Sequence, residues 1–514
     1  MDFSERDFAR RSAGVLLPVS SLPSPYGIGS FGEDARLWVD FLHDAGQSYW
    51  QVLPLAPTGK GDSPYQSFSA FAGNQYYVDF DTLEEEGLLK REEYASLIWG
   101  CADYLVDYGM LYKNRESILR KAFSRFKDDA ALDSFVKRNP WFEQYSLYMV
   151  IKATQGHKAW MDWDEPLRNR EPDAIKQIKG TLAEDIRFHA FVQYQFDRQW
   201  NALRAYANEK GIKIIGDVPI YVSLDSADVW ENCHLFQLNE NNIPIEVSGC
   251  PPDYFSEDGQ LWGNPLYDWD AMAKSGYKWW ISRLRKSFEL FDVMRLDHFR
   301  GLESYYAIPY GERTAKNGYW KPGPGKEFID VIKEAVSNAS IIAEDLGFLT
   351  DEVRELLKYS KYPGMKIVQY AFDDAETGEN IPHNYTANSV VYTGTHDNDT
   401  AKGWVRRASR DSARKAMDYV GIRHKRGLPG GMIRLALQSV SNLAVIPMQD
   451  WLELDGSARL NTPSTVGGLN WRWRVKKSEL TRQLAEKIAR ATQTYGRQRA
   501  ADATVESRKL KVES

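Results

Sequence analysis

The sequence contains little cysteine. Three residues in 514, Cys101, Cys233 and Cys250, lie far apart and outside any Cys-x-x-Cys pair. A disulfide framework needs several cysteines in a short chain, and a structural zinc site needs closely spaced thiolate and imidazole ligands. We therefore expect reduced thiols and neither of these two kinds of site.

The chain also lacks an excess of positive charge and long apolar runs. Its net charge is −6 and its pI is about 5.9, so it carries no basic surface of the kind that binds nucleic acid. No apolar run reaches the roughly 18 residues of a membrane span, and the opening residues MDFSERDFARRSAG lack the apolar core of a signal peptide. We expect a cytoplasmic protein that binds neither nucleic acid nor membranes.

Signals for a metal or a cofactor are absent as well. The eight histidines form no His-x-x-x-His pair, and no EF-hand loop is present. The stretch GIGSFG (27–32) fits the pattern Gly-x-Gly-x-x-Gly, but SSLPSPY separates it from the preceding apolar run, whereas a dinucleotide fingerprint follows its strand directly. We expect no cofactor and no catalytic metal.

Short, continuously apolar segments recur along the chain, with helical stretches such as 33–46 and 182–211 between them. Continuous rather than alternating hydrophobicity is typical of parallel strands that are covered on both faces. Eight such strands separated by helices predict a closed (β/α)8 TIM barrel of the α/β class. The predicted strands are 14–18, 49–55, 212–222, 291–297, 339–345, 365–372, 389–397 and 442–450.

One gap between these strands is too long for an ordinary connection. It predicts a mainly helical subdomain, 56–190, inserted between the second and third strands of a single catalytic domain, 1–514. Smaller insertions, 223–266 and 303–327, are expected to cover the cleft at the C-terminal face of the barrel.

Ionisable residues cluster at the ends of four predicted strands. In a TIM barrel, these ends meet at the active site. Strand alternation places Arg295 and Asp297 on one face, where the guanidinium favours the ionised carboxylate. Facing carboxylates suit glycosidic bond chemistry, which needs an ionised nucleophile and a protonated acid. Alternation leaves open whether Glu344 or Asp345 enters the site, and whether Asp397 or Asp399 does. The clustered residues are Asp217, Tyr221, Arg295, Asp297, His298, Arg300, Glu344, Asp345, His396, Asp397 and Asp399.

The composition is also rich in aromatic residues, which make up 13% of the chain and include 17 Trp. Aromatic faces suit the C–H surfaces of sugar rings, although most aromatic side chains serve packing.

At these residues the sequence resembles the 4-α-glucanotransferases of the amylomaltase or disproportionating-enzyme type, glycoside hydrolase family 77, from about Gly14 to Arg474. The motifs that carry the resemblance are SSLPSPYGIGSFG (20–32), SPYQSFSAFAGN (63–74), GDVPIYVSLDSADVW (216–230), GCPPDYFSEDGQLWGNPLYDW (249–269), RLDHFRG (295–301), AEDLG (343–347), GTHDNDT (394–400) and NTPS with NWRWR (461–474).

The resemblance implies a retaining double displacement. Asp297 is then the nucleophile, Glu344 the general acid and base, and Asp397 the acid that stabilises the transition state. The segment 249–265 resembles a loop that covers the cleft and shields the intermediate. Residues implied to bind substrate are Ser63, Tyr65, Asp217, Tyr221, Tyr254, Phe255, Trp262, Arg295, His298 and His396.

The implied substrates are α-1,4-glucans and maltooligosaccharides, whose segments pass from one glucan to the 4-hydroxyl of another or to glucose. An α-1,4-glucan hydrolase of the α-amylase type, with the same acids, is the alternative; the covering loop argues against it. A glucan-binding protein without catalysis would lack one of the three acids, and none is missing. The sequence carries no signal for an oligomeric state.

Overall fold

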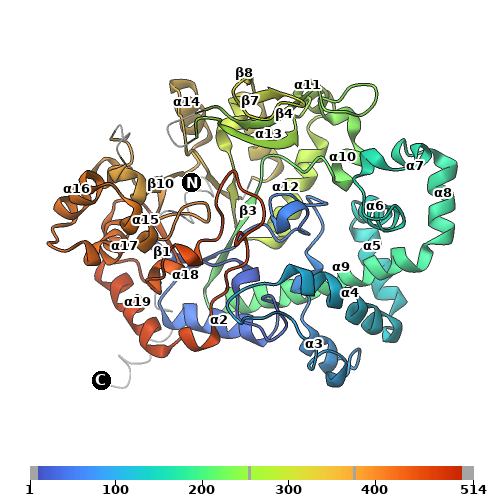
Figure 1. Ribbon diagram of the computed structural model, residues 1–514, viewed down its shortest axis with the longest axis horizontal. Coiled ribbons are helices and arrows are strands. Elements are labelled where there is room, and N and C mark those ends of the chain that lie inside the picture. The colour runs from blue at the N-terminus through green and yellow to red at the C-terminus, as the bar shows by residue number, and fades with distance from the viewer. Residues whose placement is uncertain (1–7, 9, 253–255, 338, 374–377, 500–514) are drawn as a thin grey trace.

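Eight parallel strands form a closed barrel at the centre of the protein (Figure 1). The computed structural model describes residues 8, 10–252, 256–337, 339–373 and 378–499. The predicted α/β fold class and all eight predicted strands are confirmed. Around the barrel, the strands follow the order β1 (Ser12–Leu16), β12 (Leu443–Pro447), β11 (Ser389–Tyr392), β10 (Gly364–Ile367), β9 (Ser340–Ala343), β6 (Val293–Leu296), β3 (Lys213–Val218) and β2 (Tyr49–Gln51).

The strand register brings polar residues of neighbouring strands to one level of the barrel. Asp217 of β3 pairs with Arg295 of β6, which in turn pairs with Ile342 of β9. Across the interior, the hydroxyl of Tyr392 donates to Oε1 of Gln51 at 2.9 Å. Polar contacts therefore lie inside the barrel near the carboxyl ends of its strands.

Helices cover the outside of the barrel, as the long apolar-periodic stretches predicted. The helix predicted within 33–46 ends before Gly46, whose φ of +67° suits glycine. The long helix predicted within 182–211 ends before Gly211, whose φ is +75°. The helices around the barrel are α2 (Glu33–Asp44), α9 (Ala183–Glu209), α12 (Lys278–Leu290), α13 (Gly325–Ala335), α14 (Asp351–Ser360), α15 (Ala401–Arg407), α16 (Arg410–Val420), α17 (Leu428–Gln438), α18 (Met448–Trp451) and α19 (Arg482–Thr494).

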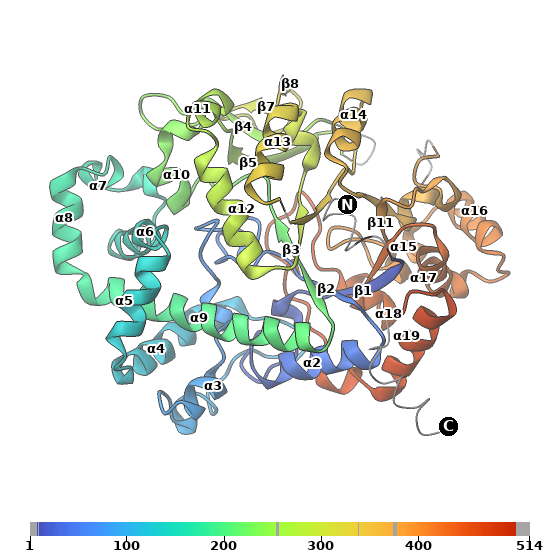
Figure 2. The ribbon, with the colours of Figure 1, turned by 180° about the vertical axis from the view of Figure 1, so that it is seen from behind.

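Between β2 and β3, the chain leaves the barrel and forms a group of helices at one end of the molecule (Figures 1 and 2). It returns to the barrel through α9. The division of the chain into a barrel, a subdomain at 56–190 and two smaller insertions stays a prediction. The helices of this group are α3 (Phe80–Glu85), α4 (Tyr108–Arg125), α5 (Asp129–Arg138), α6 (Phe142–Thr154), α7 (Glu165–Arg168) and α8 (Pro172–Thr181).

A second, antiparallel sheet joins segments that the sequence places far apart. It has the order β5 (Gln260–Pro265), β4 (Glu246–Cys250), β7 (Ser304–Pro309) and β8 (Tyr319–Pro322). Strands β4 and β5 follow β3, together with α10 (Ala227–Glu231) and α11 (Trp269–Lys274), whereas β7 and β8 follow β6. The two segments after β3 and β6 therefore form one structure.

Within the described part of the chain, no helix combines the length and the apolar character that crossing a membrane requires.

Candidate active site

Three carboxylates follow the carboxyl ends of three barrel strands. Asp297 comes directly after β6 and Glu344 directly after β9, while Asp397 lies in the loop after β11. Parallel strands of a barrel present these ends at one face. Closure of the sheet thus brings acids that are far apart in the sequence to one site.

A buried arginine holds two acids of the site. Nη1 of Arg295 donates to Oδ1 and Oδ2 of Asp217 at 2.8 and 2.9 Å and to Oδ1 of Asp297 at 2.8 Å. Its Nε donates to Sδ of Met365 at 3.4 Å. Arg295 is fixed on both sides, so the carboxylate of Asp297 has one defined orientation.

Two neighbouring carboxylates keep the guanidinium of Arg295 charged. Burial alone lowers the pKa of a guanidinium, but the carboxylates of Asp217 and Asp297 outweigh burial and raise the pKa of Arg295 above its ordinary value. The hydroxyl of Tyr65 adds a further hydrogen bond to Oδ2 of Asp217, at 2.6 Å. The guanidinium therefore stays charged beside the carboxylate of Asp297.

Glu344 is held by backbone N–H groups rather than by a cation. The N–H of His298 donates to Oε2 at 2.8 Å, and the N–H of Leu346 donates to Oε1 at 2.8 Å. His298 has φ of +54° and ψ of +51°, an uncommon conformation for a residue other than glycine. This turn directly after Asp297 aims the N–H of His298 at Glu344, so the local backbone couples the two acids.

Burial gives Glu344 the properties of a proton donor. It raises the pKa of Glu344 to about 7, and the neighbouring charge of Asp297 acts in the same direction, while Arg295 and the two N–H donors act against it. A carboxyl group with a pKa near neutrality can give and take a proton during one reaction cycle.

Asp397 is held by a short stretch near the C-terminus. Nδ2 of Asn461 donates to Oδ1 of Asp397 at 2.6 Å, and Nη2 of Arg459 donates to its backbone carbonyl at 2.5 Å. Nε2 of His396 lies 3.4 Å from Oδ2. Because the side chain of Asp397 remains 46% exposed, it can reach a ligand in the cleft.

Strand alternation leaves two pairs of acids open, and one member of each pair makes structural contacts. Asp345 accepts from the N–H of Met365 at 2.6 Å and so ties β9 to the start of β10. Asp399 pairs with Arg407 at 2.7 Å. Both acids are buried, which favours Glu344 and Asp397 as the candidate site residues.

Tyr65 lies in a stack of rings beside these acids. Its ring stacks on His396 at 5.1 Å between centroids and 18° between planes, and the ring of Trp471 lies 5.7 Å away. The N–H of Tyr65 donates to Oγ of Ser63 at 3.2 Å, so Ser63 shapes the turn that carries the ring. Tyr65, which the resemblance implies binds substrate, holds Asp217 and packs on His396 in the structure.

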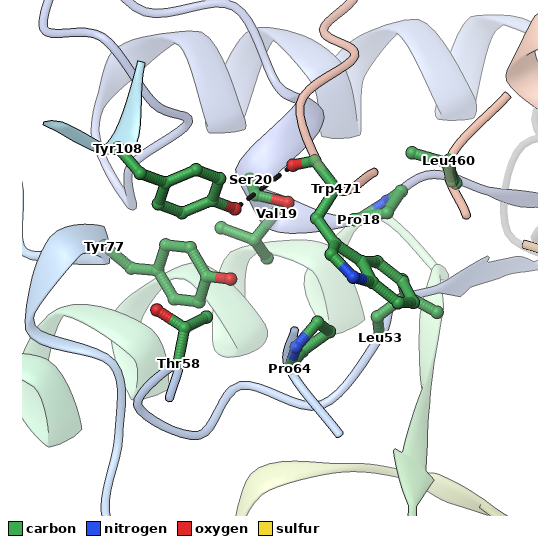
Figure 3. A pocket seen from close by; sticks show the side chains of 10 residues that line it. All are labelled: Pro18, Val19, Ser20, Leu53, Thr58, Pro64, Tyr77, Tyr108, Leu460 and Trp471. Atoms are coloured by element: carbon green, nitrogen blue, oxygen red, sulfur yellow. Dashed lines mark hydrogen bonds between the residues drawn. The ribbon is translucent and has the colours of Figure 1, made fainter. Parts of the chain in front are cut away.

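A small cavity lies next to Trp471 (Figure 3). Its volume is about 10 Å³, the size of one water molecule. The hydroxyl of Tyr108 donates to the backbone carbonyl of Trp471 at 3.1 Å, which links the inserted helices to the C-terminal wall of the site. The cavity is lined by Pro18, Val19, Ser20, Leu53, Thr58, Pro64, Tyr77, Tyr108, Leu460 and Trp471.

The second sheet also contacts the site. The ring of Trp262 in β5 meets His298 edge-on, with centroids 4.8 Å apart. Tyr221 lies 6.3 Å from Trp262 and stacks on Tyr267 at 6.0 Å. Burial lowers the pKa of His298 to about 4, so its imidazole is neutral, and its Nε2 makes no hydrogen bond to the described residues.

The structure does not describe two of the residues that the resemblance implies bind substrate. Tyr254 and Phe255 lie outside the described residues, and their predicted role stays a prediction.

Among the described residues, no group of three or more His, Cys, Asp and Glu side chains is arranged to hold a metal ion.

Comparison with known proteins decides the family. The family model described as 4-alpha-glucanotransferase, glycoside hydrolase family 77, matches residues 17–481. The chain belongs to the 4-alpha-glucanotransferase family. The 4-alpha-glucanotransferase of Clostridium butyricum is 46% identical over 93% of this chain and 99% of the relative, and that of Streptococcus pneumoniae is 47% identical over 95% and 98%. The solved amylomaltase of Streptococcus agalactiae, in complex with acarbose, is 40% identical, covers 95% of this chain and 100% of its own, and superposes with a TM-score of 0.93.

Within this 4-alpha-glucanotransferase family member, three residues of the site were not assigned from the sequence. Arg459 and Asn461 hold Asp397, and Trp471 packs on Tyr65 and His396. The polar and aromatic stretch that follows the last strand was the available signal. Its role was hidden because no spacing rule links residues 459–471 to the loop after β11.

Proposed function

We propose that the protein transfers segments of α-1,4-glucans from one maltooligosaccharide to the 4-hydroxyl of another, or to glucose, by a retaining double displacement. The observation that supports this most strongly is the pairing of an arginine-held carboxylate, Asp297, with a buried carboxyl group, Glu344, whose pKa is raised to about 7. The contact with Arg295 suits Asp297 to act as a nucleophile, and the raised pKa of Glu344 suits it to act as a proton donor, as the reaction requires.

In the first step, an oxygen of Asp297 forms a bond to C1 of the donor glucose unit while the bond from C1 to the leaving 4-oxygen breaks. Glu344 gives its proton to that oxygen. Asp397, oriented by Asn461, lies at the cleft where it stabilises positive charge that develops on the sugar ring.

In the second step, the ionised Glu344 takes the proton from the 4-hydroxyl of an acceptor glucan. The resulting oxygen attacks C1, and the bond between C1 and Asp297 breaks, which restores both acids. Two inversions retain the α configuration. Transfer requires the acceptor to outcompete water, and the aromatic walls around Trp262 and Tyr65 favour a sugar over water in the cleft.

Incubation with maltotriose tests the proposal. Longer oligomers together with glucose, resolved by chromatography, are the expected products. Glucose and maltose alone, released steadily, would instead identify an α-1,4-glucan hydrolase and refute the transferase proposal. The relatives from Clostridium butyricum and Streptococcus pneumoniae are 4-alpha-glucanotransferases, which favours transfer.

We also propose that the protein works in the cytoplasm and needs no cofactor. The low cysteine content of the chain favours a reducing compartment, and Cys101 and Cys233 form no disulfide. Activity that persists after dialysis against a chelator is the expected result. Loss of activity that added metal restores would refute the cofactor-free proposal.

A further inference from the structure

Two large aromatic side chains are exposed next to the segments that carry the catalytic acids. Phe348, four residues after Glu344, is 73% exposed, and Trp320 of β8 is 37% exposed. In both views, β8 lies beside α14, which begins three residues after Phe348 (Figures 1 and 2). We refer to Trp320 and Phe348 as the aromatic ledge.

A buried arginine joins the two members of the ledge. The guanidinium carbon of Arg300 lies 3.8 Å from the centroid of the Trp320 ring and 5.7 Å from that of Phe348. Nη1 of Arg300 also donates to the backbone carbonyl of Phe348. Arg300 is 5% exposed and lies three residues after Asp297. The same short loop that presents the nucleophile therefore also holds the ledge.

The charge of Arg300 is not used in an ion pair with the described residues. No carboxylate of the described residues lies within ion-pair distance, its Nε has no hydrogen-bond partner there, and burial lowers its pKa against the weaker attraction of Glu303. Burying an arginine without a directly paired acid is costly. Its role is therefore best explained by stacking under Trp320, where a cation on a ring face is attracted to the π system.

The second support of Trp320 comes from the sheet. Tyr306 of β7 is its register partner, and the two rings meet edge-on with centroids 5.2 Å apart. With one neighbour under the ring and another at its edge, Trp320 is held before any ligand arrives. A ring that is already fixed loses little conformational entropy on binding.

We propose that the aromatic ledge binds an α-glucan chain that extends beyond the catalytic cleft, with Trp320 as the main stacking surface and Phe348 as the second. This inference rests on the proposed function for the identity of the sugar. The ledge is joined by Arg300 to the Asp297 loop and by four residues to Glu344, so it is carried by segments that adjoin the acids. In this proposal the ledge contacts glucose units beyond those at the acids, and it therefore selects for chains longer than a trisaccharide.

Kinetics with two chain lengths test the ledge. Trp320→Ala is expected to raise KM for maltoheptaose roughly three- to tenfold, the range of one aromatic contact, with kcat unchanged. The kinetics with maltotriose should not change. Trp320→Phe keeps a ring and should restore most of the affinity. Tyr359→Ala, which removes an exposed ring from α14, is the matched control and should behave as the unaltered protein.

Binding separates failure of the ledge from failure of the proposed function. In a Glu344→Gln background, titration calorimetry with maltoheptaose should show the same loss of affinity when Trp320→Ala is added, whether or not the protein is a transferase. Equal affinities with and without Trp320 would overturn the ledge. An equal loss for maltotriose and maltoheptaose would also overturn it, as would a Trp320-dependent dimer in sedimentation, which would assign the surface to a second copy of the chain.

Discussion

The burial of Glu344 carries a cost in stability that depends on pH and that a single substitution can reveal. The pKa of Glu344 is about 7 in the fold, against 4.5 for an ordinary glutamate. Between these pH values the folded protein binds a proton that the unfolded chain has released, so stability falls as pH rises through this window and is lowest above pH 7. The difference corresponds to roughly 3 kcal/mol in total.

Glu344→Gln removes this dependence, because an amide stays neutral in both states. Glutamine keeps one acceptor oxygen, so one of the two N–H donors, those of His298 and Leu346, loses its partner, which costs about 1 to 3 kcal/mol at every pH. We therefore expect the stability of the variant, relative to the unaltered protein, to improve by roughly 2 to 3 kcal/mol between pH 5 and pH 8.

Thermal unfolding at the two pH values measures this change. For a chain of 514 residues, it corresponds to a relative shift in Tm of roughly 2 to 3 °C, since unfolding entropy grows with length. The exposed Glu240→Gln is the matched control and should show no pH-dependent difference. A Glu344→Gln variant whose Tm difference is the same at pH 5 and pH 8 would refute the argument that burial keeps this group protonated.

Three further predictions concern activity. First, kcat/KM should fall about tenfold per pH unit above an apparent pKa of about 7, because Glu344 must carry a proton in the free enzyme. A profile of kcat/KM that is flat to pH 9 would contradict this. Second, Asn461→Ala should lower kcat roughly 10- to 100-fold, because the carboxylate of Asp397 loses a charge-assisted hydrogen bond. The exposed Asn241→Ala is the control. An unchanged kcat would show that Asn461 does not position Asp397. Third, Asp297→Ala should lower turnover by several orders of magnitude with the circular dichroism spectrum preserved, and near-normal activity would refute its role as nucleophile.

The pattern of apolar segments along the chain was sufficient to predict the barrel. Each strand is a continuous apolar run because both of its faces are covered, and each run ends where polar residues begin, so strands and their active ends are local properties of the sequence. Arg295 and Asp297 could be placed together because alternation of side chains along one strand fixes their common face, and the 2.8 Å contact between them confirms it.

Other features depended on contacts between distant segments. Periodicity did not predict that β4 pairs with β7, because register between segments about 60 residues apart is set by packing and not by local pattern. It also did not separate Glu344 from Asp345. That distinction depends on Met365, whose backbone N–H donates to Asp345 and holds it in a structural hydrogen bond.

The sequence by itself therefore determined the fold class, the eight strands and the residue types of the site, since these follow from local hydrophobic patterning and from the chemistry of side chains at strand ends. Only the tertiary structure showed that Asp345 and Asp399 make structural contacts with Met365 and Arg407, and that Asn461, Arg459 and Trp471 support the site. The physical reason is that burial and hydrogen-bond partners are properties of converging segments. They set the pKa of Glu344 and the orientation of Asp397, and neither is encoded in any one stretch of the chain.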